Sequence, residues 1–219
     1  MRLLLTSAGI TNGAIAEALA ELAGRPLTEL SIIHIPTAAN TDGGDKGWVI
    51  NDLVNLQKQQ FKSVDILDVA AVGPELWQPR LAAADVICFG GGNEQYLAKV
   101  FREIGMKDFL LSVMDSKVYM GISAGSMVAG KYLQHELAAA LYPEEDFHDV
   151  AEQPMELYDF CFVPHLNSEW FAHVRKETLE GMKNRLTGPA YATDDHTAIA
   201  LHDGSLKIVG SGAHWTSAD

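Results

Sequence analysis

The sequence has few cysteines, no long hydrophobic run and no excess of positive charge. Only Cys88 and Cys161 occur among 219 residues, each inside an apolar run, which predicts buried thiols in a reducing compartment. No apolar run approaches the roughly 18 residues that span a bilayer, and the N-terminal MRLLLTSAGI lacks the longer apolar stretch of a signal peptide. We therefore expect a cytoplasmic protein without a membrane-spanning segment.

Positive charge is scarce, since 16 Lys and Arg face 29 Asp and Glu and give a formal net charge of −13. This balance argues against nucleic acid or an anionic membrane surface as a partner. It does not exclude an acidic substrate, because a local arginine can outweigh a distant acidic surface. No recognised metal-ligand spacing occurs, and that includes the surroundings of His148 in the acidic stretch 141–156.

Apolar runs typical of β-strands alternate with helical patterns along the chain. The runs lie at residues 2–8, 31–38, 63–70, 84–91 and 117–123. Continuous apolar strands separated by helices predict a mainly parallel sheet with helices on both faces. TAIALH and SLKIVG flank Asp203-Gly204, which predicts an antiparallel C-terminal hairpin with a type I′ turn. Without linkers or repeats, residues 1–219 are expected to form a single three-layer α/β domain.

The segment KVYMGISAGSMVAG (117–130) places Ser123 between two glycines, after a predicted strand and before a predicted helix. Gly-x-Ser-x-Gly in this setting is typical of a nucleophile elbow, a sharp turn that exposes the serine hydroxyl above the sheet. The amide of Ala124 would then face a developing oxyanion. A second amide is expected at Gly91, in the GGGN that follows another strand. The alternative is a tight helix start that the serine caps.

A serine nucleophile needs a base, and His165 is the best placed of the eight histidines because it ends the apolar run FCFVPH. Asp194 and Asp195, in ATDDHTAIAL, offer an orienting acid at another strand end. The order Ser123, His165, Asp195 is one arrangement. The order Ser123, Asp195, His214, as in α/β-hydrolases, fits the spacing equally well.

Four motifs, CFGGGNEQYL, GISAGSMV, VPHLNS and ATDDHTAIALHDGSLKIVGSG, resemble in order and spacing the dipeptidase E (aspartyl dipeptidase) and cyanophycinase family of serine peptidases. The resemblance extends over most of the chain and implies a fold like that of class I glutamine amidotransferases. It implies Ser123 as nucleophile, His165 as base, and cleavage after an aspartyl residue. The dipeptidase branch looks to have glutamate where this chain has Asp195. Because aspartate is one methylene shorter, we expect either a long hydrogen bond to His165 or participation of Asp194 or His196.

We therefore expect a serine-type dipeptidase that acts on a small peptide and uses no cofactor or metal. Arg175, in HVRKE, is the candidate partner of the aspartyl side chain, because a guanidinium pairs with a carboxylate in bidentate geometry. An ordinary arginine on a surface helix is the alternative. Rival functions are a small esterase with the Ser-Asp-His order and an amidotransferase-fold protein that is non-catalytic or amidase-like.

Two further helical segments, 45–60 and 168–183, carry Trp48, Trp170 and Phe171. These aromatic side chains are expected in the core or in a lid over the site, and a homodimer interface is a further option. We also expect the Ser123 hydroxyl and the His165 imidazole to meet above the rim of a single sheet.

Overall fold

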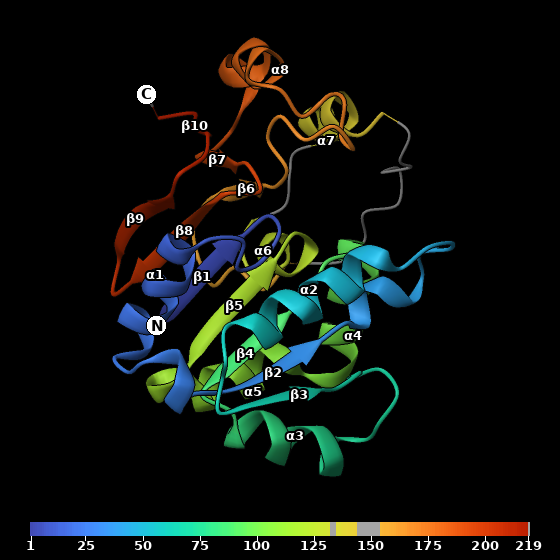
Figure 1. The fold of residues 1–219 in the computed structure, drawn as a ribbon. Helices are drawn as coiled ribbons and strands as arrows, with labels where there is room; N and C mark the ends of the chain where they lie inside the picture. The colour runs from blue at the N-terminus through green and yellow to red at the C-terminus, as the bar shows by residue number, and fades with distance from the viewer. Residues whose placement is uncertain (132–134, 144–153, 219) are drawn as a thin grey trace.

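The computed structural model describes residues 1–131, 135–143 and 154–218. Within these ranges the strands form two sheets, a large one of order β3-β2-β4-β5-β1-β8-β9 and a small one of order β10-β7-β6 (Figure 1). The strands are β1 (Arg2–Thr6), β2 (Ser31–Ile35), β3 (Ser63–Ile66), β4 (Val86–Phe89), β5 (Val118–Ile122), β6 (Cys161–Val163), β7 (Ala190–Thr193), β8 (Thr197–His202), β9 (Ser205–Gly210) and β10 (His214–Thr216).

The α-helices are α1 (Gly13–Ala23), α2 (Gly47–Lys58), α3 (Pro74–Ala83), α4 (Glu94–Ile104), α5 (Met106–Val113), α6 (Ala124–Met127), α7 (His135–Leu141) and α8 (Lys176–Met182). Short 3-10 turns lie at Leu27–Glu29, Thr37–Asn40, Met114–Ser116 and Lys183–Arg185. In the described ranges, no helix combines the length and the apolar character that crossing a bilayer demands.

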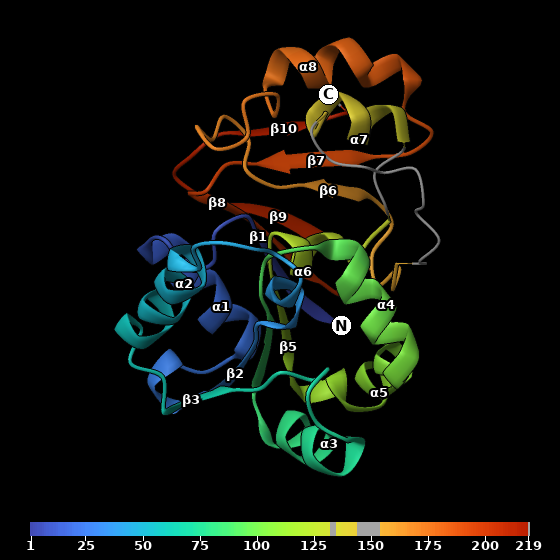
Figure 2. The same ribbon diagram turned by 90° about the vertical axis from the view of Figure 1, so that its right-hand side faces the viewer.

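The large sheet is mainly parallel, as the sequence predicts. Strands β3, β2, β4, β5 and β1 pair in parallel, and β8 and β9 add an antiparallel edge. Helices α1 and α2 cover one face, while α3, α4 and α5 cover the other (Figure 2). Successive residues of β1 show this two-sided burial, since Leu4 packs into the core under α1 and Leu5 into the opposite core. The α/β architecture is therefore confirmed.

Helix α1 illustrates how local signals set an element. Asn12 accepts a hydrogen bond from the amide of Ile15 at 3.1 Å, and Gly24 ends the helix at φ 70°. Its buried residues recur at the helical spacing and are Ile15, Ala18, Leu19 and Leu22. Each of the large aliphatic side chains contributes about 2 kcal/mol by burial, so tertiary packing stabilises this helix more than propensity does.

The hairpin that joins β8 to β9 has the predicted turn. Asp203 and Gly204 adopt φ values of 49° and 80°, which are the two positive angles that a type I′ turn requires. The last strand of the main sheet therefore returns antiparallel beside β8.

The small sheet was not foreseen. Strand β6 lies in the apolar run that His165 ends. It pairs in parallel with β7, and β10 pairs antiparallel with β7. Helices α7 and α8 pack on this sheet through buried apolar side chains that include Leu137, Leu141 and Leu179. Figures 1 and 2 place the whole layer at one end of the molecule. Three residues, 194–196, connect β7 to β8 and so join the two sheets. The single-domain organisation stays a prediction.

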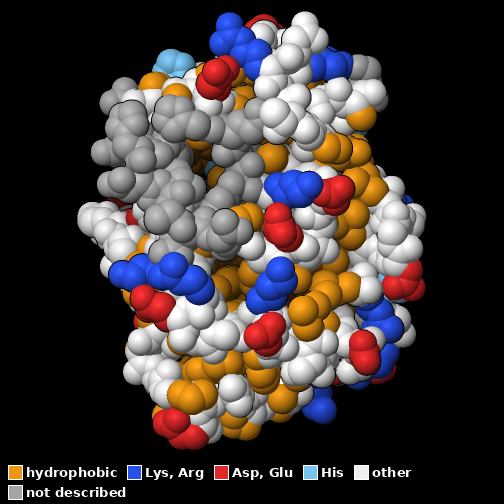
Figure 3. All heavy atoms as spheres, turned by 180° about the vertical axis from the view of Figure 1, so that it is seen from behind, with side chains coloured by type: hydrophobic (Ala, Val, Ile, Leu, Met, Phe, Trp, Pro, Cys, Tyr) orange, Lys and Arg blue, Asp and Glu red, His pale blue; other side chains and the backbone are white. Residues whose placement is uncertain are grey.

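Two expected helices differ from the structure. The helix after the elbow, α6, has only four residues, and His135 begins the separate helix α7. The segment 168–183 is helical only over Lys176–Met182. Most of the acidic stretch, with His148, lies outside the described residues. On the described part of the face in Figure 3, basic, acidic and apolar side chains are interspersed.

Candidate active site

The serine motif forms a sharp turn between strand and helix. Strand β5 ends at Ile122, Ser123 adopts φ 48° and ψ −111°, and α6 begins at Ala124. The amide of Ser123 donates to the Thr6 carbonyl at 2.9 Å, which fixes the turn against β1. A positive φ at a non-glycine residue is strained and persists only where surrounding contacts hold it. The expected elbow geometry is therefore present at Ser123.

The glycines of the motif are required by close backbone contacts. A Cβ at Gly125 would lie 2.1 Å from the Phe89 carbonyl oxygen, and one at Gly121 would lie 2.5 Å from the Ser126 nitrogen. Real Cβ atoms do not approach backbone so closely. The helix after the serine can thus pack on β4 and β5 only when both positions lack side chains.

Gly125→Ala is expected to lower the free energy of unfolding by about 3 kcal/mol or more, because the added methyl group overlaps backbone that cannot move independently. Urea denaturation followed by circular dichroism measures this loss. Gly181→Ala in α8 is the matched control, since nothing lies within 4 Å of its Cβ position. The control should be unchanged or more stable by up to about 1 kcal/mol. Equal stability of Gly125→Ala and the wild type would contradict the packing argument.

Three side chains from separate segments meet at the elbow. His165 Nε2 lies 3.0 Å from Ser123 Oγ, and His165 Nδ1 lies 2.7 Å from Asp195 Oδ1. Because the carboxylate accepts from the Nδ1–H, Nε2 is left as the acceptor for the serine hydroxyl. The His165 side chain is 16% exposed and that of Asp195 is 35% exposed, so the pair lies at the margin of solvent. This arrangement can withdraw a proton from Ser123.

The geometry distinguishes Asp194 from Asp195 as the acid that pairs with His165. Asp194 accepts from the amides of His196 at 3.0 Å and Ala213 at 2.6 Å, so its carboxylate shapes the connection into β8. Asp195 approaches His165 closely although its side chain is short, and the expectation of a long hydrogen bond is wrong. Its backbone is held near the imidazole, since its carbonyl accepts from Thr11 Oγ1 at 2.7 Å. Backbone placement therefore compensates for the missing methylene.

His165 does not rise from the same sheet as Ser123, and the expectation of a single rim is wrong. Ser123 follows β5 of the large sheet, whereas His165 follows β6 of the small one. The site therefore lies where the small sheet meets the carboxyl ends of the parallel strands.

The end of β1 ties these segments together, a role that sequence reasoning missed. The buried Ser7 hydroxyl accepts from the His165 amide at 3.1 Å and donates to the Thr193 carbonyl at 2.8 Å. Ser126 Oγ donates to the Thr6 carbonyl at 2.9 Å and accepts from the Thr6 amide at 3.0 Å. The signal was the polar Thr6-Ser7 pair at the carboxyl end of an apolar strand. One strand end thus links the serine, histidine and aspartate segments.

The two expected oxyanion donors flank the serine. A Cβ at Gly91 would lie 3.4 Å from Ser123 Cβ, so the glycine stands beside the nucleophile. The next residue, Gly92, has φ 126°, and a Cβ there would overlap the Ala38 carbonyl. Within the described ranges, the amides of Gly91 and Ala124 donate to no backbone acceptor. Their donation to a developing oxyanion next to Ser123 stays a prediction.

Side chains from α2 and β2 lie beside Gly90 and Gly91. Trp48 Cζ3 lies 3.5 Å from the Cβ position of Gly91, and the Lys46 ammonium lies 5.7 Å from the Trp48 ring centroid. His34 lies against Gly90, and burial lowers the pKa of its imidazole to about 4, which keeps it neutral. Burial also raises the pKa of Asp52, one turn after Trp48, to about 7. The sequence alone placed neither His34 nor Asp52 at the candidate site.

The predicted carboxylate partner, Arg175, makes other contacts. Its Nη1 donates to the carbonyls of Phe171 at 2.8 Å and Val174 at 2.9 Å, and its Nη2 donates to the Ser168 carbonyl at 2.9 Å. Phe171 stacks on the His165 ring, with centroids 4.7 Å apart and planes 14° apart. The guanidinium of Arg175 thus bonds the backbone of the turn that precedes it. Its contact with a substrate stays a prediction.

The expected placement of the aromatic residues is only partly right. Trp170 is 83% exposed, so the core expectation is wrong for it, and Trp48 is 37% exposed. Phe171 is half-buried against His165. In the described part of the chain, no group of three His, Cys, Asp or Glu side chains is arranged to hold a metal ion.

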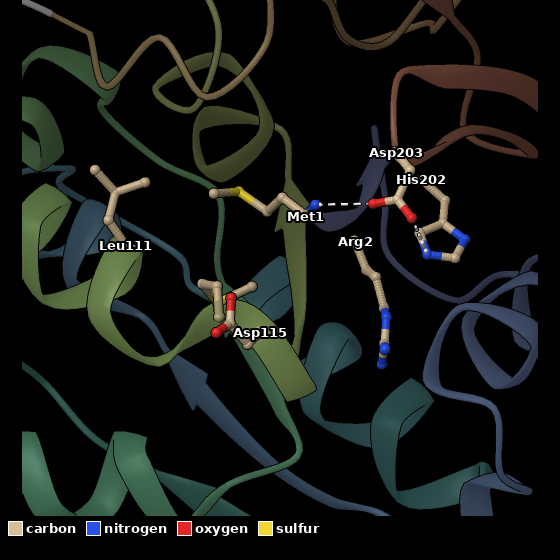
Figure 4. A pocket seen from close by; sticks show the side chains of 7 residues that line it. Met1, Arg2, Leu111, Asp115, His202 and Asp203 are labelled. Carbon is tan, nitrogen blue, oxygen red and sulfur yellow. Dashed lines mark hydrogen bonds and ion pairs between the residues drawn. The ribbon is translucent and has the colours of Figure 1, made fainter.

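A separate hollow of about 440 Å³ opens at the other end of the sheet (Figure 4). It is lined by Met1, Arg2, Leu111, Met114, Asp115, His202 and Asp203. Asp203 accepts from the N-terminal amine at 3.3 Å and lies 3.2 Å from His202 Nε2. Because β1 runs from Arg2 towards Thr6, this hollow lies at the amino ends of the parallel strands, away from Ser123.

Comparison with known proteins places this geometry in a family. The model of peptidase family S51 matches residues 3–209. An uncharacterized peptidase of Pasteurella multocida (strain Pm70) is 25% identical over 183 residues, which are 83% of this chain and 86% of that protein.

Solved structures have the same fold. A putative peptidase E protein from Listeria monocytogenes EGD-e superposes with a TM-score of 0.73 at 20% identity, covering 96% of this chain and 98% of that one. A peptidase from an acI-B1 actinobacterium gives a TM-score of 0.69 at 19% identity, covering 97% and 88%.

Proposed function

Since the chain belongs to peptidase family S51, a family of serine peptidases, we propose that it hydrolyses peptide bonds through an acyl-enzyme formed on Ser123. The observation that carries this proposal is the pair of hydrogen bonds that runs from Ser123 through His165 to Asp195. The Ser-His-acid order agrees with the order that the sequence resemblance implies.

In the proposed mechanism, His165 Nε2 takes the hydroxyl proton while Ser123 Oγ attacks the scissile carbonyl carbon. Asp195 holds the Nδ1–H and stabilises the imidazolium that forms. The negative charge on the former carbonyl oxygen is stabilised by the amides of Gly91 and Ala124. His165 then gives its proton to the leaving amine, the C–N bond breaks and the acyl-enzyme remains. A water molecule, deprotonated by the same imidazole, releases the acid and restores Ser123.

We further propose that the substrate is a dipeptide with an N-terminal aspartyl residue. Because the protein has a net charge of −13, an acidic substrate needs a local cation at the site. Lys46 lies beside Trp48 next to Gly91 and is the candidate for that cation. The guanidinium of Arg175 bonds the backbone of the turn that carries Phe171 instead.

A turnover panel of Asp-X, Glu-X and neutral dipeptides beside simple esters tests this function. We expect Asp-X to be hydrolysed about 100-fold faster, in kcat/KM, than a neutral dipeptide, which corresponds to one charge-assisted hydrogen bond. Liquid chromatography of the released amino acids gives the rates. Equal turnover of neutral dipeptides would refute the aspartyl preference. Turnover of esters alone would favour the esterase hypothesis.

A further inference from the structure

We propose that Arg175 is a positioning residue for the His165 imidazole, acting through the turn 168–174 and the ring of Phe171. This role rests on the proposed function, because it concerns the base of the same reaction. It differs from the role expected from the sequence, in which Arg175 contacts the substrate.

The guanidinium of Arg175 binds three backbone carbonyls of one turn. Arg175 donates to the carbonyls of Ser168, Phe171 and Val174 at 2.8–2.9 Å, so one planar group joins the beginning, middle and end of the turn. The Asn167 amide also donates to the Val174 carbonyl at 2.8 Å. Charge-assisted bonds in a fixed fork geometry hold backbone more rigidly than neutral single bonds. The turn therefore has little freedom while Arg175 is in place.

This turn carries the aromatic ring that stacks on the imidazole of His165. The Phe171 ring lies nearly parallel to the His165 ring, 4.7 Å away between centroids. The imidazole is thus bounded on one face by Phe171, at Nδ1 by Asp195 and at Nε2 by Ser123. The two hydrogen bonds set the direction of the ring edges, and the stacked ring limits its tilt. Since Arg175 binds the carbonyl of Phe171, it controls where this stacking ring lies.

The backbone is strained at the histidine. His165 and Asn167 have φ values of 63° and 65°, in the left-handed region that non-glycine residues rarely adopt. Such conformations persist where neighbouring contacts over-determine them. The Ser168 amide donates to the His165 carbonyl at 3.0 Å, and Arg175 holds the other side of Ser168. Without the guanidinium, the strained segment that presents His165 can relax.

Kinetics of Arg175→Ala and Arg175→Lys separate positioning from substrate contact. Misplacement of the base should lower kcat about 100-fold, with KM unchanged and with the same factor for acidic and neutral dipeptides. Lysine should not rescue the activity, because a point charge cannot bind three carbonyls as the fork does. A rise in KM confined to acidic substrates, with rescue by lysine, would overturn the proposal. Lys176→Ala removes the adjacent exposed cation and should leave kcat and KM unchanged.

Covalent labelling with a fluorophosphonate gives a second readout that needs no peptide substrate. Ser123 Oγ forms a bond to phosphorus and fluoride leaves, while His165 accepts the proton. If the wild type does not label at Ser123, the proposed peptidase chemistry fails, whatever Arg175 does. If it labels, Arg175→Ala and Phe171→Leu should each react about 100-fold more slowly at unchanged melting temperature.

The double variant Arg175→Ala/Phe171→Leu tests whether both residues act through one ring. We expect it to label no more slowly than the slower single variant, since each substitution removes the same constraint. Phe171→Tyr keeps the stacked ring and should label at close to the wild-type rate. Multiplied losses in the double variant, or a wild-type labelling rate in Arg175→Ala, would overturn the proposal.

Discussion

Replacing Ser123 with alanine is expected to lower kcat/KM for peptide hydrolysis by about 10⁴-fold to 10⁶-fold, because the acyl-enzyme can no longer form. The residual rate would come from binding and from the amides of Gly91 and Ala124. Initial rates with an Asp-X dipeptide measure the loss. If a fluorophosphonate still labels the variant at another serine, mass spectrometry of the modified peptide will identify that serine.

The fold should survive this substitution. The turn is held by backbone bonds, from the Ser123 amide to Thr6 and from the Ser126 amide to the Ser123 carbonyl, and alanine keeps both. Ser126→Ala is the matched control, because it removes a hydroxyl from the same motif without removing the nucleophile. Its buried hydroxyl bonds both the amide and the carbonyl of Thr6, so its loss should cost about 1–3 kcal/mol of stability while the nucleophile stays in place. An unchanged hydrolysis rate in Ser123→Ala would remove the nucleophile assignment.

The elements that the sequence predicted well are those with local signals. Gly121 and Gly125 mark the elbow because each lies where a Cβ would meet backbone. Asp203-Gly204 marks the hairpin turn because both residues need positive φ. Helix α1 is marked by Asn12 as its N-cap and by four apolar residues at helical spacing, which the structure buries. In each case the physical cause lies within a few residues of the signal.

The features that the sequence did not predict depend on contacts between distant segments. An apolar run such as β6 is buried in either sheet, so hydrophobicity alone cannot say which partner it pairs with. Ser7 lies 158 residues from His165 and looks like any hydroxyl at a strand end until the two are brought together. Arg175 bonds to carbonyls that carry no side-chain signature, so its bonding to the turn is invisible in the sequence. The close Asp195–His165 contact likewise results from where Thr11 holds the backbone.

His165→Ala is expected to lower kcat/KM about as much as Ser123→Ala, by about 10⁴-fold to 10⁶-fold, because members of such a unit fail together. His214→Ala should change the rate by no more than about 2-fold, as for a surface position outside the site. The reason is geometric. His165 Nε2 lies 3.0 Å from Ser123 Oγ, whereas His214 is exposed and pairs through β10 with Thr193 of β7. Both variants are assayed with the same dipeptide, and their folded state is checked by circular dichroism.

This pair of histidines decides between the three functions that the sequence left open. If His214→Ala is inactive and His165→Ala retains activity, the esterase order Ser123, Asp195, His214 is correct. The roles proposed for Phe171 and Arg175 then lose their basis. If neither the wild type nor any variant turns over a substrate or labels at Ser123, the elbow belongs to a non-catalytic amidotransferase-fold protein. If only His165→Ala loses hydrolysis, the proposed reaction is supported. In that reaction the imidazole of His165, which Asp195 holds at 2.7 Å, takes the proton from Ser123.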